Sequence, residues 1–272
     1  MRRILGMLAF VVLAPTTHVA AQSGPLIAAH RGGAALWPEN SLLAFRGALA
    51  LGVDLLELDV HLSADGEVVV LHDATLDRTT TGHGPVREAT TATLASLRLR
   101  AREGHVTDEP IPTLAQVLDL AAPTHAGVLP EIKVGADGRP YPGIEEKVLA
   151  LLGARGLLAR ATVQAFAPET IRRLRELAPG VRTMLLVGRA RVERARVTPA
   201  TAVQWTVDAG ATDLGIDHRL VDRSVVDAAR KASVRLAVWT VNDEMDMRRV
   251  IDLGVDAIMT DRPDLLRRLQ TR

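Results

Sequence analysis

The sequence predicts a single-domain α/β fold, a (β/α)8 TIM barrel, and three observations support this prediction. Short apolar segments alternate with segments of helical spacing, which is typical of a parallel sheet with helices between its strands. Eight such apolar segments can be counted, and eight strand-helix units in about 250 residues are typical of a closed barrel. No Gly-x-Gly-x-x-Gly turn follows the first segment, which disfavours an open dinucleotide-binding sheet.

The expected strands are short stretches rich in Val, Leu, Ile and Ala. They are residues 26–29, 55–60, 127–132, 161–165, 181–187, 211–216, 234–240 and 257–260. Between them, apolar residues recur three and four apart, as at Leu42, Phe45 and Leu49 within residues 41–51, and again within residues 168–177. We expect these segments to be helices that cover the outside of the barrel.

Residues 74–113 form the one long irregular stretch, rich in Thr, Gly and charged residues. We interpret it as an elaborated loop of the barrel rather than a domain, with a size that suits a lid over a site. Just before it, the pair Asp65-Gly66 between Leu62 and Val68 predicts a tight turn. The chain would double back there and return His72 to the barrel rim.

The N-terminus has the order of a secretory signal peptide, with Arg2-Arg3, an apolar run over residues 4–13 and small residues at positions 19 and 21. The apolar run is too short to cross a bilayer, which takes about 20 residues. We expect residues 1–21 to be a signal peptide cleaved after Ala21, and residues 22–272 to form the barrel. The protein would be exported, periplasmic or secreted, without stable insertion in a membrane after cleavage.

The composition excludes several kinds of site and partner. There is no cysteine, so disulfides, thiolate metal sites and a cysteine nucleophile are excluded. A net charge of +1 offers no general attraction for nucleic acid or an anionic membrane. The arginines of residues 189–196 are interpreted as a solvated helix face, because no aromatic residues alternate with them.

Charged side chains lie near the carboxyl ends of the early strands, the edge at which barrel active sites are found. Glu57 and Asp59 are two residues apart on the second strand, and Glu131 and Lys133 repeat this spacing on the third, so each pair can point into the barrel mouth. Three carboxylates there would repel one another unless a cation lay among them, and oxygen ligands favour Mg²⁺ or Ca²⁺. The alternative is a buried ion network with Lys133 and Arg31.

His30 and His72 follow strands at the same rim, and two histidines flanking a scissile bond can supply an acid and a base. Alone, either would be interpreted as structural, but Arg31 and Asp73 adjoin them, and a guanidinium binds phosphate in a bidentate manner. Lys133 would add a second positive group for the same phosphate. We interpret the other six histidines as surface or loop residues: His18, His61, His83, His105, His125 and His218.

Three further residues have both a structural and a functional interpretation. Glu39 comes just before the helix that begins near Ser41, where Asn40 or Ser41 could cap the helix. Gln164 and Trp239 lie near strand ends, where they could pack in the barrel or contact substrate, with the Trp ring as one wall of a pocket.

Several of these residues belong to short motifs in a fixed order. The motifs are His30-Arg31-Gly32, Pro38-Glu39-Asn40-Ser41, Glu57-Leu58-Asp59, Asp65-Gly66, His72-Asp73, Arg78-Thr79-Thr80-Thr81-Gly82, Glu131-Ile132-Lys133, Gln164, Trp239-Thr240-Val241-Asn242 and Thr260-Asp261-Arg262-Pro263. Together they resemble the pattern of the glycerophosphodiester phosphodiesterase family over nearly the whole mature chain. Two departures are mild: Ser41 stands where Thr is usual, and Ala165 stands where Ser is typical.

The resemblance implies the barrel fold and the hydrolysis of a glycerophosphodiester to an alcohol and sn-glycerol 3-phosphate with a divalent metal. Carried over by position, it implies that Glu57, Asp59 and Glu131 bind the metal. His30 and His72 would be the acid and base, in an order the sequence leaves open. The implied phosphate and substrate contacts are Arg31, Lys133, Glu39, Gln164 and Trp239, with Glu39 supporting the His30 end of the site.

Two alternatives remain open for the function. One is a phospholipase D-like or lysophospholipid phosphodiesterase on the same barrel, which needs an apolar groove for acyl chains. Leu36, Trp37 and the loop of residues 74–113 could line that groove. The other is an exported protein that binds glycerophosphodiesters without hydrolysing them.

Overall fold

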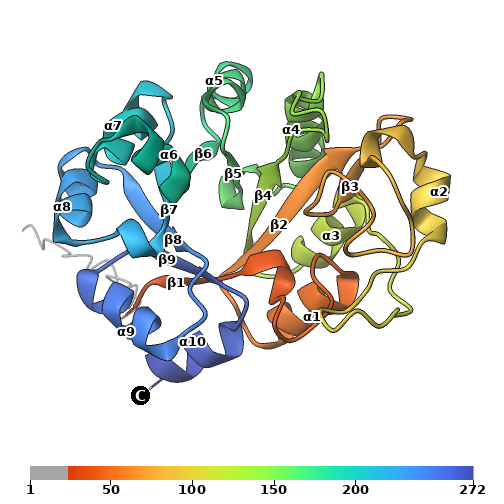
Figure 1. Ribbon diagram of the computed structural model, residues 1–272, viewed down its shortest axis with the longest axis horizontal. Coiled ribbons are helices and arrows are strands. Elements are labelled where there is room, and N and C mark those ends of the chain that lie inside the picture. The colour runs from red at the N-terminus through yellow and green to blue at the C-terminus, as the bar shows by residue number, and fades with distance from the viewer. Residues whose placement is uncertain (1–23, 272) are drawn as a thin grey trace, which may run out of the picture.

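Eight parallel strands close into a barrel in the computed structural model, which describes residues 24–271 (Figure 1). Each strand of the ring pairs with the next, and β1 pairs with both β2 and β9, so the ring has no free edge. The strands are β1 (Leu26–Ala29), β2 (Leu55–Leu62), β4 (Gly127–Ile132), β5 (Thr162–Ala165), β6 (Arg182–Val187), β7 (Asp213–Asp217), β8 (Arg235–Trp239) and β9 (Ala257–Thr260). The predicted barrel and all eight predicted strands are confirmed, with strand ends shifted by two residues at most. The predicted signal peptide, residues 1–21, lies outside the described residues.

Helices surround the strands, as Figure 1 shows. The main ones are α1 (Leu42–Ala50), α3 (Leu114–Ala121), α4 (Ile144–Ala154), α5 (Pro168–Leu177), α6 (Arg189–Ala195), α7 (Thr201–Asp208), α8 (Arg223–Lys231), α9 (Glu244–Leu253) and α10 (Pro263–Gln270). The large hydrophobic core lies between them and the ring. Leu56, Leu58 and Val60 belong to it, so these β2 side chains face outward as the alternation predicts. Within residues 24–271, no helix is both long and apolar enough to cross a membrane.

The chain doubles back after β2, as the sequence predicts. β3 (Val68–Val70) pairs antiparallel with the end of β2, and Gly66 in the turn has a φ of 81°, a conformation that glycine adopts without strain. Residues 74–113 then form a loop that contains a 3-10 turn, η2 (Val86–Glu88), and a short helix, α2 (Thr91–Ser96). This loop has a small apolar core of its own beside β3, made by Val69, Leu71, Leu76, Val86, Leu94, Leu99 and Ile111. It is therefore more ordered than its composition indicates.

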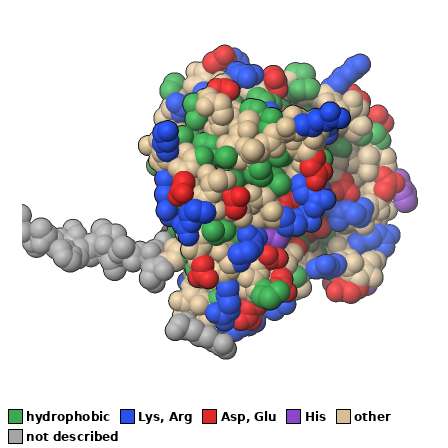
Figure 2. All heavy atoms as spheres, turned by 60° about the vertical axis from the view of Figure 1, so that its left-hand side comes forward, with side chains coloured by type: hydrophobic (Ala, Val, Ile, Leu, Met, Phe, Trp, Pro, Cys, Tyr) green, Lys and Arg blue, Asp and Glu red, His purple; other side chains and the backbone are tan. Residues whose placement is uncertain are grey.

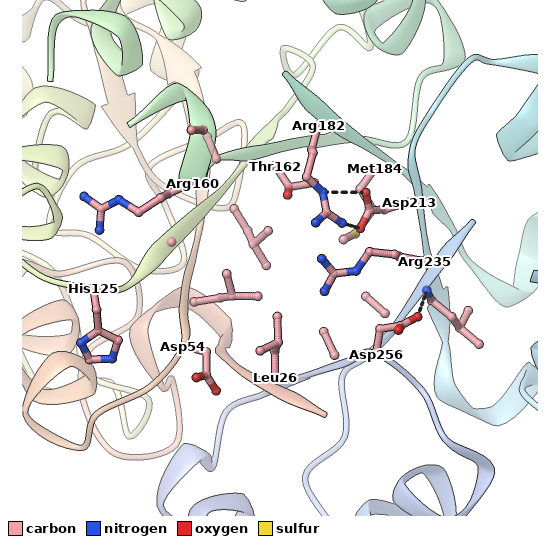
Figure 3. A pocket seen from close by; sticks show the side chains of 18 residues that line it. Leu26, Asp54, His125, Arg160, Thr162, Arg182, Met184, Asp213, Arg235 and Asp256 are labelled. Atoms are coloured by element: carbon pink, nitrogen blue, oxygen red, sulfur yellow. Dashed lines mark hydrogen bonds and ion pairs between the residues drawn. The ribbon is translucent and has the colours of Figure 1, made fainter. Parts of the chain in front are cut away.

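A cavity of about 330 Å³ lies at the amino-terminal ends of the strands (Figure 3). Its charged groups are largely paired within the protein. The guanidinium of Arg182 bonds the carboxylate of Asp213, and Asp256 accepts the backbone N–H of Leu236 at 2.7 Å. Arg160 donates to backbone carbonyls near the start of β4, including that of Ala126 at 3.0 Å. The charged groups at this end of the barrel therefore join neighbouring strands to one another.

Candidate active site

A smaller cavity, of about 100 Å³, opens at the carboxyl ends of the strands. Eight of the ten predicted site residues line it: His30, Arg31, Glu57, His72, Glu131, Lys133, Gln164 and Trp239. The other two adjoin it, because Glu39 bonds a guanidinium nitrogen of Arg31 at 3.0 Å and Asp59 lies 3.5 Å from Arg31 Nε. The fold thus brings all ten residues to one place.

Three buried carboxylates gather at this cavity, two of them, Glu57 and Glu131, in its lining and the third, Asp59, beside it. Glu57, Asp59 and Glu131 each offer an oxygen, and these oxygens lie within 4.8 Å of one another. Burial and the neighbouring Asp59 raise the pKa of Glu57 to about 7, and burial also raises the pKa of Glu131. Burial alone would raise the pKa of Asp59 too, but Lys133 and Arg31 hold it well below its usual range.

The nearby cations balance these acids only in part. Lys133 Nζ lies 2.8 Å from Glu131 and 3.4 Å from Asp59. Glu57 is bonded by neutral donors, the backbone N–H of Arg31 at 2.8 Å and the side-chain amide of Gln164 at 2.9 Å. The amide oxygen of Gln164 is buried without a hydrogen-bond partner among the described residues. Among the described residues, an ion network with Lys133 and Arg31 therefore leaves Glu57 without a bonded cation and the Gln164 oxygen without a donor. These oxygen ligands fit a hard divalent cation.

A tight turn after β1 aims the backbone of the His-Arg-Gly segment at these acids. Arg31 has a φ of 51° and Gly32 a φ of 82°. A Cβ on Gly32 would lie 2.7 Å from the Cβ of Ala44, so only glycine fits between this turn and α1. The turn directs the N–H of Arg31 to Glu57 and holds its side chain against Asp59.

His30 is held from the far end of the chain. Its Nδ1 lies 2.6 Å from Oδ1 of Asp261, which follows β9, and Asn242 donates to the other oxygen of Asp261 at 2.7 Å. This contact leaves Nε2 as the ring nitrogen that can exchange a proton. Burial would lower the pKa of His30, but the negative charges of Glu57 and Asp261 raise it above its usual value.

His72 is held by its neighbour in the sequence. Its Nδ1 lies 2.7 Å from Oδ1 of Asp73, and burial lowers its pKa. Below it, His61 is fully buried, with Nδ1 3.0 Å from the hydroxyl of Tyr141 and Nε2 3.2 Å from the carbonyl oxygen of His72. Burial lowers the pKa of His61 to about 4, so the ring is neutral at pH 7.

The expectation that His61 is a surface or loop residue is therefore wrong. β2 continues to Leu62, two residues beyond its predicted end, and the hairpin with β3 covers the added residues. His218 is also buried, with its ring and carbonyl oxygen beside the guanidinium of Arg249.

Glu39 lies between two arginines. It accepts from Arg31 at 3.0 Å and from Arg78 at 2.8 and 3.1 Å, and no hydrogen bond joins it to His30 in the described part of the chain. Asn40 does not cap α1. Its side chain donates to Asp59 at 2.9 Å, while Ser41 caps α1 by accepting the N–H of Ala44 at 3.0 Å.

Apolar side chains also line the cavity. Phe166 and Trp239 meet edge to face with ring centroids 5.6 Å apart, and Phe166 is 45% exposed at the rim. Leu186 and Met259 are the other two apolar side chains in its lining. The indole N–H of Trp239 is buried without a hydrogen-bond partner among residues 24–271, so it is a donor that a bound ligand could satisfy.

The sequence assigned no role to Asp261, Asn242 or Arg78, although each belongs to a motif quoted above. Asp261 and His30 are 231 positions apart. Only the closure of the barrel, which pairs β9 with β1, places them together. The sequence held one signal of this contact: the motif His30-Arg31-Gly32 contains no carboxylate, so a partner for His30 had to come from elsewhere in the chain.

Comparison with known proteins identifies the family. The model of the glycerophosphoryl diester phosphodiesterase family matches residues 30–265. The chain belongs to this family. A glycerophosphodiester phosphodiesterase of Caldanaerobacter subterraneus subsp. tengcongensis is 35% identical over 89% of this chain and 96% of its own length. Another from Bacillus subtilis is 31% identical over 98% of this chain and 94% of its own length.

Solved structures of the family have the same fold. The glycerophosphodiester phosphodiesterase of Agrobacterium tumefaciens superposes with a TM-score of 0.73 at 30% identity, over 90% of this chain and 99% of that one. A phosphodiesterase of Oleispira antarctica, solved with the product sn-glycerol 3-phosphate, gives a TM-score of 0.75 at 25% identity, over 92% of this chain and 98% of that one. The protein is thus a glycerophosphodiester phosphodiesterase, as the motifs predict, with a substrate of the glycerophosphodiester type.

Proposed function

We propose that the protein hydrolyses glycerophosphodiesters to an alcohol and sn-glycerol 3-phosphate, with His30 and His72 as acid and base and a divalent metal as cofactor. One observation carries the proposal. Both histidines line the same cavity as Glu57 and Glu131, which form one buried group of carboxylates with Asp59 beside the cavity. Each imidazole has Nδ1 held by an aspartate. The Oleispira relative, solved with sn-glycerol 3-phosphate, supports this choice of product.

The metal would be held by Glu57, Asp59 and Glu131, whose oxygens are close enough to share one ion. Carboxylate ligands favour Mg²⁺ or Ca²⁺. When bound, such an ion neutralises charge that develops on the phosphodiester. Arg31 and Lys133 line the same cavity and add fixed positive charge for the phosphate.

The two histidines handle protons through their free ring nitrogens. One imidazole removes a proton from the nucleophile, either water or the glycerol 2-hydroxyl, as its oxygen bonds to phosphorus. The other imidazole donates a proton to the oxygen of the leaving alcohol as its bond to phosphorus breaks. With the 2-hydroxyl, a cyclic phosphate forms first and water then opens it. Each transfer contributes roughly 10²- to 10⁴-fold to the rate. Asp261 and Asp73 fix the orientation of the two rings.

Export is a further part of the proposal, and it rests on the signal-peptide pattern of residues 1–21. Outside the cytoplasm, the enzyme would meet glycerophosphodiesters released by phospholipid breakdown. N-terminal sequencing of the protein recovered from the periplasm or medium should begin at Gln22. An uncleaved chain that stays in the cytoplasm would contradict this part.

A nucleic-acid partner is not proposed. On the face shown in Figure 2, basic and acidic side chains are interspersed. Such a surface provides no continuous stripe of positive charge for a phosphate backbone.

A lysophospholipid phosphodiesterase is the second candidate, and a surface groove favours it. A cavity of about 270 Å³ is lined by the apolar residues Leu36, Trp37 and Pro38 and by a largely polar segment, Ala101, Arg102, Glu103, His105 and Thr107. These are the segments that the sequence predicts for an acyl-chain groove. If lysophosphatidylcholine is a substrate, Leu36→Asp should lower its turnover and leave that of glycerophosphocholine unchanged.

The decisive experiment is an assay of sn-glycerol 3-phosphate release from glycerophosphocholine by residues 22–272. Mg²⁺, Ca²⁺ and a chelator would be compared, together with His30→Ala and Glu57→Ala. We expect release that needs metal and is lost in both variants, while His125→Ala at the opposite end of the barrel keeps full activity. Tight binding of glycerophosphocholine without product would favour a binding protein instead.

A further inference from the structure

Arg78 lies at the start of the loop of residues 74–113 and bonds two carboxylates at once. Its Nε and Nη2 donate to the two oxygens of Asp73 at 2.7 and 2.8 Å. Its Nη1 and Nη2 donate to the two oxygens of Glu39 at 3.1 and 2.8 Å. A guanidinium has five N–H donors and can make these four hydrogen bonds, whereas a lysine ammonium has three N–H donors and cannot.

Both carboxylates also bind a residue of the cavity. Asp73 contacts Nδ1 of His72 at 2.7 Å, and Glu39 accepts from Arg31 at 3.0 Å. A continuous chain of charged hydrogen bonds therefore runs from His72 through Arg78 to Arg31. It joins the segment after β1 to the segment after β3, which no backbone pairing connects at this point among the described residues.

We propose that Arg78 is a positioning residue that fixes His72 and Arg31 relative to each other and anchors the loop of residues 74–113 to the active site. This inference rests on the proposed function for its kinetic part. Arg78 acts through its two carboxylate partners, since it does not line the catalytic cavity itself.

The charges explain why loss of Arg78 should affect both His72 and Arg31, the two ends of this series of hydrogen bonds. Without the guanidinium, Asp73 and Glu39 would face each other as like charges and move apart. Glu39 would then share its charge with Arg31 alone and compete more strongly with the phosphate for it. Asp73 would lose the contact that fixes its orientation, and His72 would lose a fixed partner. Poorer phosphate binding raises KM, and a misplaced histidine lowers kcat.

The test compares Arg78→Ala, Arg78→Lys and a matched control, Arg98→Ala. Arg98 belongs to the same loop, but its guanidinium donates to backbone carbonyls of residues 95–97, away from the site. With glycerophosphocholine, we expect Arg78→Ala to lose roughly 10- to 100-fold in kcat/KM, shared between kcat and KM. Guanidinium ion at millimolar concentration should restore part of the loss in Arg78→Ala. Arg78→Lys should recover only part of the wild-type rate.

Kinetics of Arg78→Ala equal to those of Arg98→Ala would overturn the inference. Thermal unfolding of each variant shows whether it is folded, and Arg78→Lys carries the test if Arg78→Ala is not. Calorimetric binding of sn-glycerol 3-phosphate separates this inference from the proposed function, because it needs no turnover. If the wild type binds the ligand but releases no product, the proposed function fails alone. Weaker binding by Arg78→Lys than by Arg98→Ala then still supports the role of Arg78, and equal binding overturns it.

Discussion

His30 and His72 are held by carboxylates from different parts of the fold: Asp261 follows barrel strand β9, and Asp73 lies just before the loop of residues 74–113. The two rings are therefore held with different firmness. Asp261 is itself held on both sides by Asn242, which donates to its carboxylate at 2.7 Å and accepts its backbone N–H at 2.8 Å. Asp73 depends on an arginine that is 48% exposed. The His30 side of the site is therefore fixed by the barrel, and the His72 side is fixed by the loop.

Asp261→Asn tests the rigid side. The amide keeps the size of the side chain but removes the charge and can present an N–H to Nδ1 of His30, which favours the wrong tautomer. We expect kcat on glycerophosphocholine to fall at least roughly 10-fold with little change in the thermal unfolding temperature. The control is Asp264→Asn, since Asp264 lies on α10 and bonds Arg262 just before the helix and Arg268 within it. An unchanged kcat in Asp261→Asn would show that His30 does not need this partner.

At the scale of elements, the turn between β2 and β3 holds α2 in place. The Oδ1 atom of Asp65 accepts from the backbone N–H of Thr91 at 2.9 Å, from the Thr91 hydroxyl at 2.8 Å and from Ser63 Oγ at 2.7 Å. These hydrogen bonds from Ser63 and Thr91 lower the pKa of Asp65 from 3.8 to about 2. The ionised carboxylate is therefore the form that tethers the loop.

A depressed pKa fixes the direction of the pH effect. The tether is fully present above pH 3.8 and is lost as the pH falls toward 2. Asp65→Ala should imitate the acid form at neutral pH. We expect faster hydrogen exchange of the amides of α2, while those of β4 keep their protection. Asp108→Asn, elsewhere in the same loop, is the control, and equal exchange in the two variants would contradict the prediction.

The helices and strands could be predicted from local periodicity. The contacts that form when the barrel closes could not. The alternation of Glu57, Leu58 and Asp59 fixed which side chains face the barrel mouth, because side chains alternate along a strand. His61 was misplaced because nothing in the local pattern shows that β2 continues under a hairpin. Asp261 could not be assigned to His30, because their contact depends on the register between the first and last strands.

At the scale of the whole molecule, the barrel interior limits the size of the side chains that fill it. A Cβ on Gly215 in β7 would lie 2.6 Å from a Leu186 methyl carbon and 2.7 Å from the Met184 sulfur. Gly215→Val should therefore overpack the barrel and cost about 1–3 kcal/mol in the free energy of unfolding. Urea denaturation measures this cost. Gly180→Val is the control, since a Cβ there meets nothing within 4 Å, and equal loss in both variants would argue against the interior position.

The three buried carboxylates of the site also bear on the stability of the whole chain. Their oxygens lie within 4.8 Å of one another, and like charges at such distances destabilise a folded protein. A cation that binds only the folded chain offsets this repulsion. At a free concentration of 100 times Kd, such binding contributes about 2.7 kcal/mol to the free energy of unfolding.

We therefore expect Mg²⁺ or Ca²⁺ to raise the thermal unfolding temperature and a chelator to reverse the rise. Glu57→Gln should abolish this response, because it removes one of the three charges that hold the ion. In chelator, the same variant should unfold at a temperature at least equal to that of the wild type, because the repulsion is reduced while Gln can still accept from the Arg31 N–H. Glu176→Gln on the surface of α5 should respond to metal like the wild type. Equal responses of Glu57→Gln and Glu176→Gln would place any bound cation elsewhere, since only the first substitution changes the carboxylate cluster.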